Sequence, residues 1–400
     1  MKHLKENLTA IVSLLIIPLS GMATDIYVPS LPALSEYFST TQYLSQFTVT
    51  AYLLGYSISQ LFSGIIVDVA GTRRTSIISL LIFTILNYFI LISTNIYMVC
   101  LFRVLQGISV GFFAVAQRSI MPNIFKHDPE KMRNMINYAM ITWSLGPIVA
   151  PAIGGYLQHL FGWKYNFIFL ATYSLCMLIF VIFITIEAIE NKIDFNFEII
   201  KSSYHTILSN KIFILSVLCL SCIYSVSILF ATIGSFIIQN QMHYNSIFFG
   251  YCSLSMGVTW FIGSISNKYI TKINHYKKII FCLKIMLIIY SISIITNIFI
   301  NGFYSFVIFI ILSNIFAGVI FSSYYAKNLS MFPKYSGNAA GLMSSGLIMI
   351  TAIISSIFSK LITKHQIIML LTANFILILI CYILTRIIIN KHNNTNMVTY

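Results

Sequence analysis

The sequence predicts an all-α membrane protein with twelve transmembrane helices in two six-helix bundles. Only 8% of the 400 residues are charged and 58% are hydrophobic, whereas about 25% of a soluble domain is charged. Apolar runs of about 20 residues, the length that crosses the hydrocarbon core as a helix, recur along the chain. The longest gap between these runs divides them into six and six. These observations exclude a soluble enzyme and a disordered chain.

The first predicted span is too long, and too polar at its end, for a cleaved signal peptide. The twelve spans are expected at residues 8–28, 43–67, 75–94, 98–121, 134–157, 164–186, 211–238, 246–267, 279–299, 304–326, 338–360 and 366–389. We therefore expect an N-terminal bundle at 1–186, a cytoplasmic central loop at 187–210 and a C-terminal bundle at 211–400.

The basic residues orient the chain. Eighteen of the 24 Lys and Arg residues lie in gaps on one side of the predicted membrane. The remainder lie on the other side (Lys164, Lys360, Lys364) or within spans (Arg103, Arg118, Lys284). Since positive loops stay in the cytoplasm, we expect both termini there. The formal charge of +14 reflects scarce acid, because only ten acids occur and Glu198 is the last. We therefore expect no nucleic-acid partner.

The two halves contain similar segments. Residues 101–122 align without a gap to residues 312–333, pairing Gly107 with Gly318 and Pro122 with Pro333. After the second span, Gly64-x-x-x-Asp68 similarly matches Gly263-x-x-x-Asn267 after the eighth. Parallel six-span repeats are typical of one large class of transporters, whose substrate site lies between the halves.

Asp25 is the only carboxylate within any predicted span, and an ionisable group in a membrane is a functional candidate. Because burial disfavours a charged carboxylate, we expect Asp25 to exchange a proton with the external side in competition with substrate. The alternative is an interfacial Asp that caps a loop at 29–42. Arg103, about five residues into span 4, is always charged and can hold two acceptors. Its alternative role is to snorkel to the interface. Gln106 follows one turn later.

The gap after span 2 contains Gly64, Asp68, Gly71, Arg73 and Arg74. Its two glycines permit a tight turn and close helix approach. Asp68 is expected to bond a free helix N-terminal N–H group or to pair with Arg73. A plain cytoplasmic turn with topology-setting arginines is the alternative.

Span 5 combines helix-bending and small residues, namely Gly146, Pro147, Pro151, Gly154 and Gly155. Prolines can kink a helix, and glycines let helices approach closely. Such a span could pivot during transport or simply pack tightly. Other polar and aromatic residues within spans could line a cavity or simply pack: Tyr52, Tyr56, Gln60, Gln117, Trp143 and Tyr224. Aromatic walls would suit apolar or cationic drugs.

The chain resembles the major facilitator superfamily, and more narrowly the drug:H+ antiporters of the Bcr/CflA type. Four segments carry the resemblance: TDIYVPSLP (24–32), GIIVDVAGTRR (64–74), RVLQGISVG (103–111) and GPIVAPAIGGYL (146–157). It implies the major facilitator fold, a coupling or substrate role for Arg103, cytoplasmic gating at 64–74, and a span 5 that limits leakage. Three positions depart from the family pattern: Val69 where a basic residue is usual, Thr72 before Arg73, and Pro122-Asn123 in place of a basic–acidic pair.

We therefore expect proton-coupled multidrug efflux by alternating access across the bacterial inner membrane. The expected partners are a small-molecule substrate, protons and the lipid bilayer, and the expected state is a monomer without metal or cofactor. The alternatives are a dedicated exporter of a metabolite such as a siderophore, and a non-transporting membrane receptor. An enzyme is not expected, because the sequence has no phosphate-binding loop, nucleophile elbow or H-E-x-x-H motif. Cys219-x-x-Cys222, inside an apolar span, is interpreted as structural.

Overall fold

The computed structural model describes residues 2–188, 197–270, 273–300, 302–332, 335–362 and 366–397. Every regular element in these ranges is helical, and twelve helices are long and apolar enough to cross a membrane. Each overlaps one predicted span, so the all-α membrane fold is confirmed. Three sequence interpretations fall outside the described residues: the middle of the central loop (189–196), Pro333 and Lys364.

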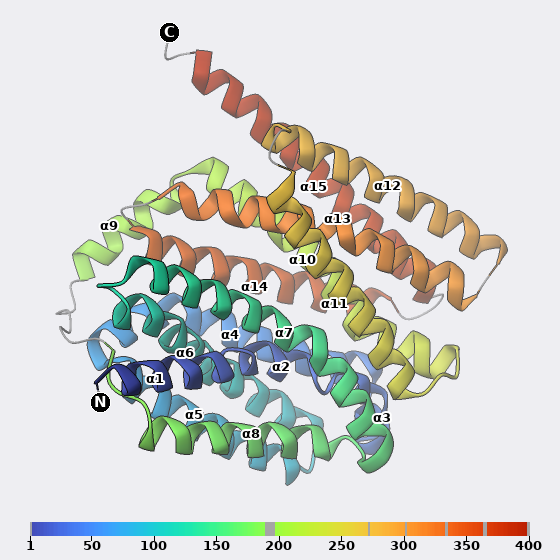
Figure 1. Cartoon of the computed structure of the whole chain (residues 1–400). Helices are drawn as coiled ribbons and strands as arrows, with labels where there is room; N and C mark the ends of the chain where they lie inside the picture. The colour runs from blue at the N-terminus through green and yellow to red at the C-terminus, as the bar shows by residue number, and fades with distance from the viewer. Residues whose placement is uncertain are drawn as a thin grey trace. The chain divides into compact units, whose positions relative to one another are not determined.

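Contacts divide the chain into two compact units: residues 1–197 with 245–251, and residues 198–244 with 252–400. In the first unit, α4 (Gln42–Ala70) packs along α6 (Ile96–Ile124), and α5 (Thr72–Leu91) lies between α6 and α8 (Lys164–Phe183) (Figure 1). The long helix α7 (Pro129–Phe161) packs mainly against the first membrane helix. The seven residues 245–251 thus group with the N-terminal helices.

The first membrane helix is broken into four pieces. They are α1 (Lys2–Ile16), α2 (Leu19–Asp25), the 3-10 turn η1 (Val28–Ser30) and α3 (Leu31–Tyr37). Pro18 precedes α2, and η1 and α3 each begin with a proline in the first turn. A first-turn proline is compatible with a helix because its missing N–H group would have no partner there. The expected loop at 29–42 is therefore wrong, since its first part continues as helix to Tyr37.

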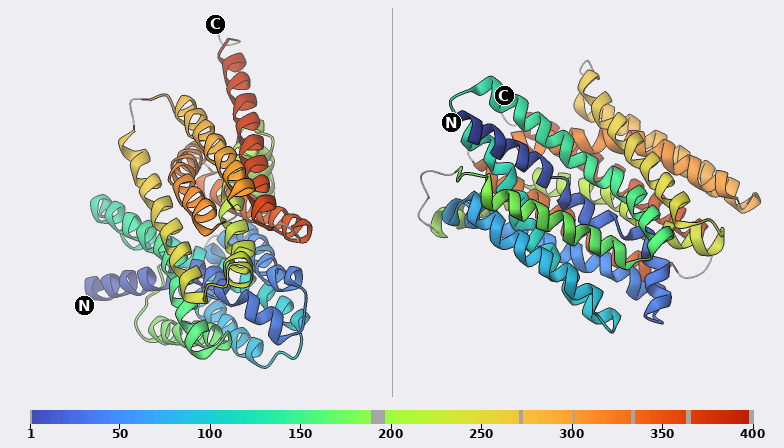
Figure 2. Two further views of the ribbon diagram at one scale, coloured as in Figure 1. Left: turned by 90° about the vertical axis from the view of Figure 1, so that its right-hand side faces the viewer. Right: turned by 60° about the horizontal axis from the view of Figure 1, so that its bottom comes forward.

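In the second unit, α10 (Lys211–Phe236) packs against α13 (Phe303–Ser330), α14 (Ser336–Leu361) and α15 (Gln366–Met397). It ends in the π-helical turn η2 (Ile237–Gln241), and α11 (Ser246–Tyr269) follows. The helix α12 (His275–Phe299) lies beside α13 and α15 (Figure 2). A further helix, α9 (Phe197–Leu208), occupies part of the predicted central loop, and Ser203 on it accepts a hydrogen bond from Asn338 of α14 at 2.7 Å.

The internal repeat appears in the structure as two equivalent helix crossings, one between α4 and α6 and one between α11 and α13. A Cβ on Gly55 of α4 would lie 2.0 Å from the Val104 carbonyl oxygen, and one on Gly263 of α11 would lie 1.9 Å from that of Ile315. The partner glycines, Gly107 and Gly318, make the reciprocal approach. Gly263 therefore corresponds to Gly55.

The predicted match of Gly64 with Gly263 has the wrong register. A Cβ on Gly64 would meet no atom of the described residues within 4 Å, so this glycine makes no close helix approach there.

Candidate functional site

Arg103 lies at the centre of the candidate site. Its side chain is fully buried, and its guanidinium carbon lies 4.3 Å from the ring centroid of Tyr27 and 4.2 Å from that of Tyr52. Nη1 donates to the Ala23 carbonyl at 3.1 Å and to Oε1 of Gln106 at 2.9 Å. Arg103 therefore does not snorkel to the interface: it stacks between two aromatic rings inside the unit.

The break in the first membrane helix supplies two of these contacts. Because α2 ends at Asp25, carbonyl groups of its last turn have no regular helical partner. One of them, from Ala23, accepts from Arg103. Tyr27 lies in the break, between α2 and η1, and its hydroxyl lies 3.0 Å from Oγ1 of Thr48. From α4, the Tyr52 hydroxyl donates to the Ser20 carbonyl at 3.0 Å. Hydrogen bonds thus fix both rings around the guanidinium group.

The positive charge of Arg103 has no carboxylate in contact. Among the described residues, no carboxylate lies within 4 Å of it, and Nε and Nη2 are buried without a hydrogen-bond partner. A buried charge without an anionic partner is costly, which makes this position attractive to a negative group. Asp25, two residues after Ala23 and partly exposed, is the acid on the adjoining segment.

All but one of the other predicted cavity residues lie in the first unit, and Tyr224 lies in the second. Tyr56 and Gln60 are buried on α4 near Tyr52, whose ring centroid is 6.1 Å from that of Tyr56. Gln117 is buried further along α6 and donates to Ser76 of α5 at 2.7 Å, so it joins two helices. Trp143 on α7 is 38% exposed. Tyr224, which belongs to the second unit, has its ring 6.2 Å from Phe321. Tyr27 was not among the predicted residues, although it lies within the TDIYVPSLP segment.

The turn after α4 is organised by an acid that sequence analysis did not single out. Gly71 has φ +92°, which a glycine adopts without strain. Directly after it, Thr72 donates from its N and its Oγ1 to Oε1 of Glu187, and the Arg73 N donates to Oε2 at 3.2 Å. Glu187 therefore accepts from free N–H groups at the start of α5.

Asp68 makes neither contact expected of it within the described residues. It lies in the last turn of α4, with no hydrogen bond or ion pair there. The Arg73 guanidinium instead donates to the Ile182 carbonyl at 2.6 Å, while Arg74 is exposed. Glu187 takes the helix-capping position because it follows α8, which lies beside α5.

The small residues of α7 make close contacts on two sides. A Cβ on Gly146 would lie 2.4 Å from the Pro18 carbonyl oxygen. A Cβ on Gly154 would lie 1.6 Å from the Ile26 carbonyl oxygen. Pro147 fills the space beside Gly21.

On its other side, α7 meets the beginning of α11. A Cβ on Gly155 would lie 2.5 Å from the Ser246 carbonyl oxygen, and Gly250 packs against Pro151. Ser246 Oγ donates to the Gly155 carbonyl at 2.9 Å. The predicted close packing of span 5 is thus present, and it includes the segment that carries Asp25.

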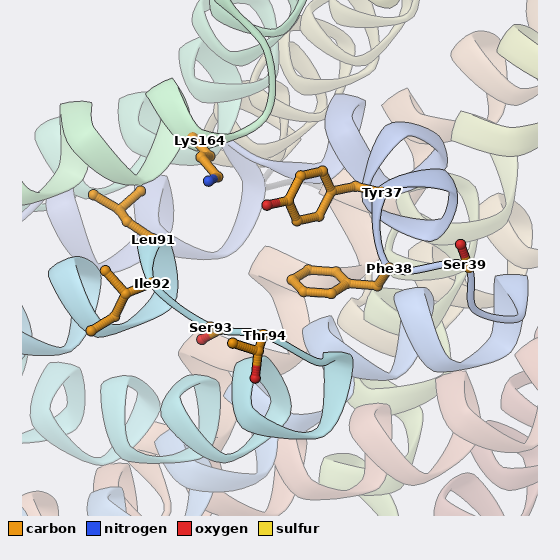
Figure 3. A pocket seen from close by; sticks show the side chains of 8 residues that line it. All are labelled: Tyr37, Phe38, Ser39, Leu91, Ile92, Ser93, Thr94 and Lys164. Carbon is orange, nitrogen blue, oxygen red and sulfur yellow. The ribbon is translucent and has the colours of Figure 1, made fainter.

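A separate depression of about 480 Å³ lies away from Arg103 (Figure 3). The rings of Tyr37 and Phe38 project into it opposite Leu91 and Ile92, and the Lys164 amine lies 5.2 Å from the Tyr37 ring centroid. The remaining lining residues are Ser39, Ser93 and Thr94. Aromatic rings beside a lysine are typical of a membrane–water interface.

Comparison with known proteins identifies the family. The model of the Major Facilitator Superfamily matches residues 14–347. The chain belongs to the major facilitator superfamily. As a member it is a multi-pass membrane protein.

Two relatives of this superfamily member have names that describe resistance. The chain is 25% identical to the "Bicyclomycin resistance protein homolog" of Haemophilus influenzae over 359 residues, 86% of each chain. It is 25% identical to "Multidrug resistance protein D" of Escherichia coli over 171 residues, 42% of this chain and 43% of the relative. Matches to the first three curated relatives span only 34%, 43% and 63% of those proteins. These names agree with the predicted Bcr/CflA resemblance.

Solved structures share the superfamily fold. A D-xylose–proton symporter gives a TM-score of 0.74 at 14% identity, over 95% of this chain and 96% of that one. A bacterial homolog of the human lysosomal transporter Spinster gives 0.75 at 12% identity, over 96% and 98%. At such low identity these structures establish the fold alone.

Proposed function

We propose that this chain is a proton-coupled exporter of small molecules in the bacterial inner membrane, working by alternating access with both termini in the cytoplasm. The observation that carries the proposal is the buried Arg103, which contacts no carboxylate of the described residues and lies beside the broken segment ending in Asp25. The names of the relatives support drug-like cargo, and the Lys and Arg distribution supports the orientation.

The proposed cycle has two competing occupants of one site. In one state Asp25 is ionised and interacts with Arg103. When Asp25 takes up a proton, the Arg103 charge is left for substrate or for a rearranged helix contact. An inward proton gives about 2.3 kcal/mol for each 100 mV of membrane potential. The small residues of α7 contact the segment that carries Asp25. In the proposed cycle, a change in the protonation of Asp25 can therefore alter the packing of α7.

The test is drug efflux from proteoliposomes that contain the full chain under an imposed pH gradient. Asp25→Asn is expected to abolish gradient-driven transport while leaving substrate binding measurable. Glu36→Gln is the matched control, because Glu36 is an exposed acid on α3, a later piece of the same membrane helix. Wild-type transport by Asp25→Asn, or transport unaffected by an uncoupler, would overturn the proposed coupling.

A dedicated metabolite exporter is the second candidate, and the charge distribution favours it. No Asp or Glu occurs between residues 199 and 400, so an anionic cargo such as a siderophore would meet little repulsion from that half. Metabolite release and drug susceptibility in a deletion strain separate the two candidates. Loss of metabolite release with unchanged drug susceptibility would favour the dedicated exporter.

A further inference from the structure

One end of the second unit gathers basic side chains from three helices. They are His275, Lys277 and Lys278 at the start of α12, Lys268 at the end of α11, and Lys327 at the end of α13. Lys268 and Lys277 are exposed, whereas His275, Lys278 and Lys327 are half-buried. We call these five residues the basic cluster.

The two half-buried lysines are held by neutral groups. Lys327 Nζ donates to the Tyr276 hydroxyl at 2.8 Å and lies 4.0 Å from the centroid of that ring. Lys278 Nζ donates to Oδ1 of Asn267 and, at 3.3 Å, to the Ile270 carbonyl. Dipoles of this kind orient an ammonium group but do not neutralise its charge.

His275 adds a further unsatisfied group between the lysines. Its ring centroid lies 5.0 Å from that of Tyr276 and 6.2 Å from that of Tyr324. Nε2 is buried without a hydrogen-bond partner among the described residues. Both Lys278 and Lys327 are close enough to interact electrostatically with the ring. The basic cluster therefore contains lysine ammonium groups that repel one another and a His275 ring nitrogen that makes no hydrogen bond to the described residues.

No acid of this chain balances the cluster among the described residues. Neither half-buried lysine is in an ion pair there, and Glu198 is the last acid in the sequence. Lysines that serve only to set topology extend into water, whereas Lys278 and Lys327 turn inward to Asn267 and Tyr276. Partly desolvated cations without a counter-charge are costly, so an anion from outside the chain would stabilise this arrangement.

We propose that the basic cluster binds the phosphate group of an anionic phospholipid of the cytoplasmic leaflet. The site lies at the ends of three membrane helices, on the side that the proposed orientation places in the cytoplasm. Basic pockets between helices on that side are suited to anionic headgroups, and each lysine contributes about 1 kcal/mol near such a surface. This lipid site is separate from the Arg103 site and does not depend on the identity of the transported molecule.

The experiment measures lipid binding rather than transport. The full chain in detergent is titrated with phosphatidylglycerol or phosphatidylcholine, and bound lipid is measured by native mass spectrometry. The unmodified chain is expected to retain phosphatidylglycerol selectively. Lys278→Gln/Lys327→Gln is expected to weaken that binding at least about tenfold. Lys201→Gln/Lys211→Gln, which removes two exposed lysines of the same unit, should change it less than twofold.

Two further arms keep the result interpretable. Lys278→Arg/Lys327→Arg retains both charges and should keep most of the binding, which guards against a Gln variant that fails to fold. Equal loss in the folded Arg and Gln variants would overturn recognition by charge. Inorganic phosphate at millimolar concentration should not displace the lipid. Displacement would identify free phosphate as the occupant and overturn the lipid assignment, as would equal lipid retention by the two Gln double variants.

Discussion

Glu187 accepts two hydrogen bonds from Thr72 through one carboxylate oxygen, with Thr72 N and Oγ1 each 2.7 Å from Oε1. These residues are 115 positions apart. The contact joins the segment after α8 to the first turn of α5, where a negative group is favoured by the helix dipole. It fixes the turn that contains Gly71.

Replacing Glu187 by Ala should destabilise the protein by about 1–2 kcal/mol, the usual cost of losing a helix cap. The free N–H groups of Thr72 and Arg73 would lose their common acceptor. Thermal unfolding in detergent measures the effect as a lower midpoint. Glu36→Ala, which removes an exposed acid away from a helix N-terminus, should leave the midpoint unchanged, and equal midpoints for the two variants would contradict the capping role.

Gly154→Ala should be strongly destabilising, by more than about 2 kcal/mol, because its methyl group would lie 1.6 Å from the Ile26 carbonyl oxygen. Relief would require movement of backbone. Gly64→Ala is the matched control in another membrane helix, where the methyl group would meet nothing within 4 Å in the described part of the chain. Alanine is the better helix former by about 1 kcal/mol, so this variant should unfold at an equal or higher temperature. A larger loss for Gly64→Ala than for Gly154→Ala would contradict the packing described.

Arg103→Lys should reduce transport at least about tenfold even though it keeps the charge. A lysine has no planar group to stack between Tyr27 and Tyr52, and this stacking is what holds Nη1 in reach of both the Ala23 carbonyl and Gln106 Oε1. Initial rates in proteoliposomes measure the loss. The control is Arg118→Lys, since Arg118 Nε donates to a carbonyl of its own helix, and its rate should stay within twofold. Wild-type rates in Arg103→Lys would show that the stacked geometry is unimportant.

Gly263→Ala should be as damaging as Gly55→Ala, because each methyl group would lie about 2 Å from a carbonyl oxygen of the partner helix. Surface expression and thermal midpoint should fall in parallel in the two variants. Gly337→Ala, at an exposed position where a Cβ would meet no described atom within 4 Å, controls for the substitution itself. Tolerance at only one of the two equivalent glycines would argue against the repeated crossing.

Run length was enough to predict the membrane helices, and residue type was enough to select Arg103 as a candidate site residue. A membrane span can be recognised from local sequence alone, because a run of about twenty apolar residues is typical of a transmembrane helix. Of the partners of Arg103, Tyr27 was harder to predict than Tyr52 and Gln106. Tyr27 is one of 24 tyrosines, and only the break after Asp25 turns its ring toward the guanidinium group.

Contacts between segments that are distant in the sequence could not be predicted from the local residue pattern. Glu187 is one of four acids in the predicted central loop, and only the packing of α5 beside α8 brings it to Thr72. The error at Gly64 has the same origin. A Gly-x-x-x-polar spacing occurs by chance at several places in an apolar chain, whereas the true equivalent of Gly263 is recognised by the carbonyl that it meets.

That carbonyl contact limits how the sequence can change. At Gly55, Gly107, Gly263 and Gly318 the nearest obstacle to a side chain is a backbone oxygen, so a glycine hydrogen points toward an acceptor and can form a weak Cα–H···O bond. In lipid, where apolar burial gives helices little reason to associate, such contacts hold them together. Because every residue type has the same carbonyl, no smaller side chain on the partner helix can compensate for a larger residue at these glycines. Second-site suppressors of Gly55→Ala should therefore be absent from the facing positions and appear only where they let a whole helix shift.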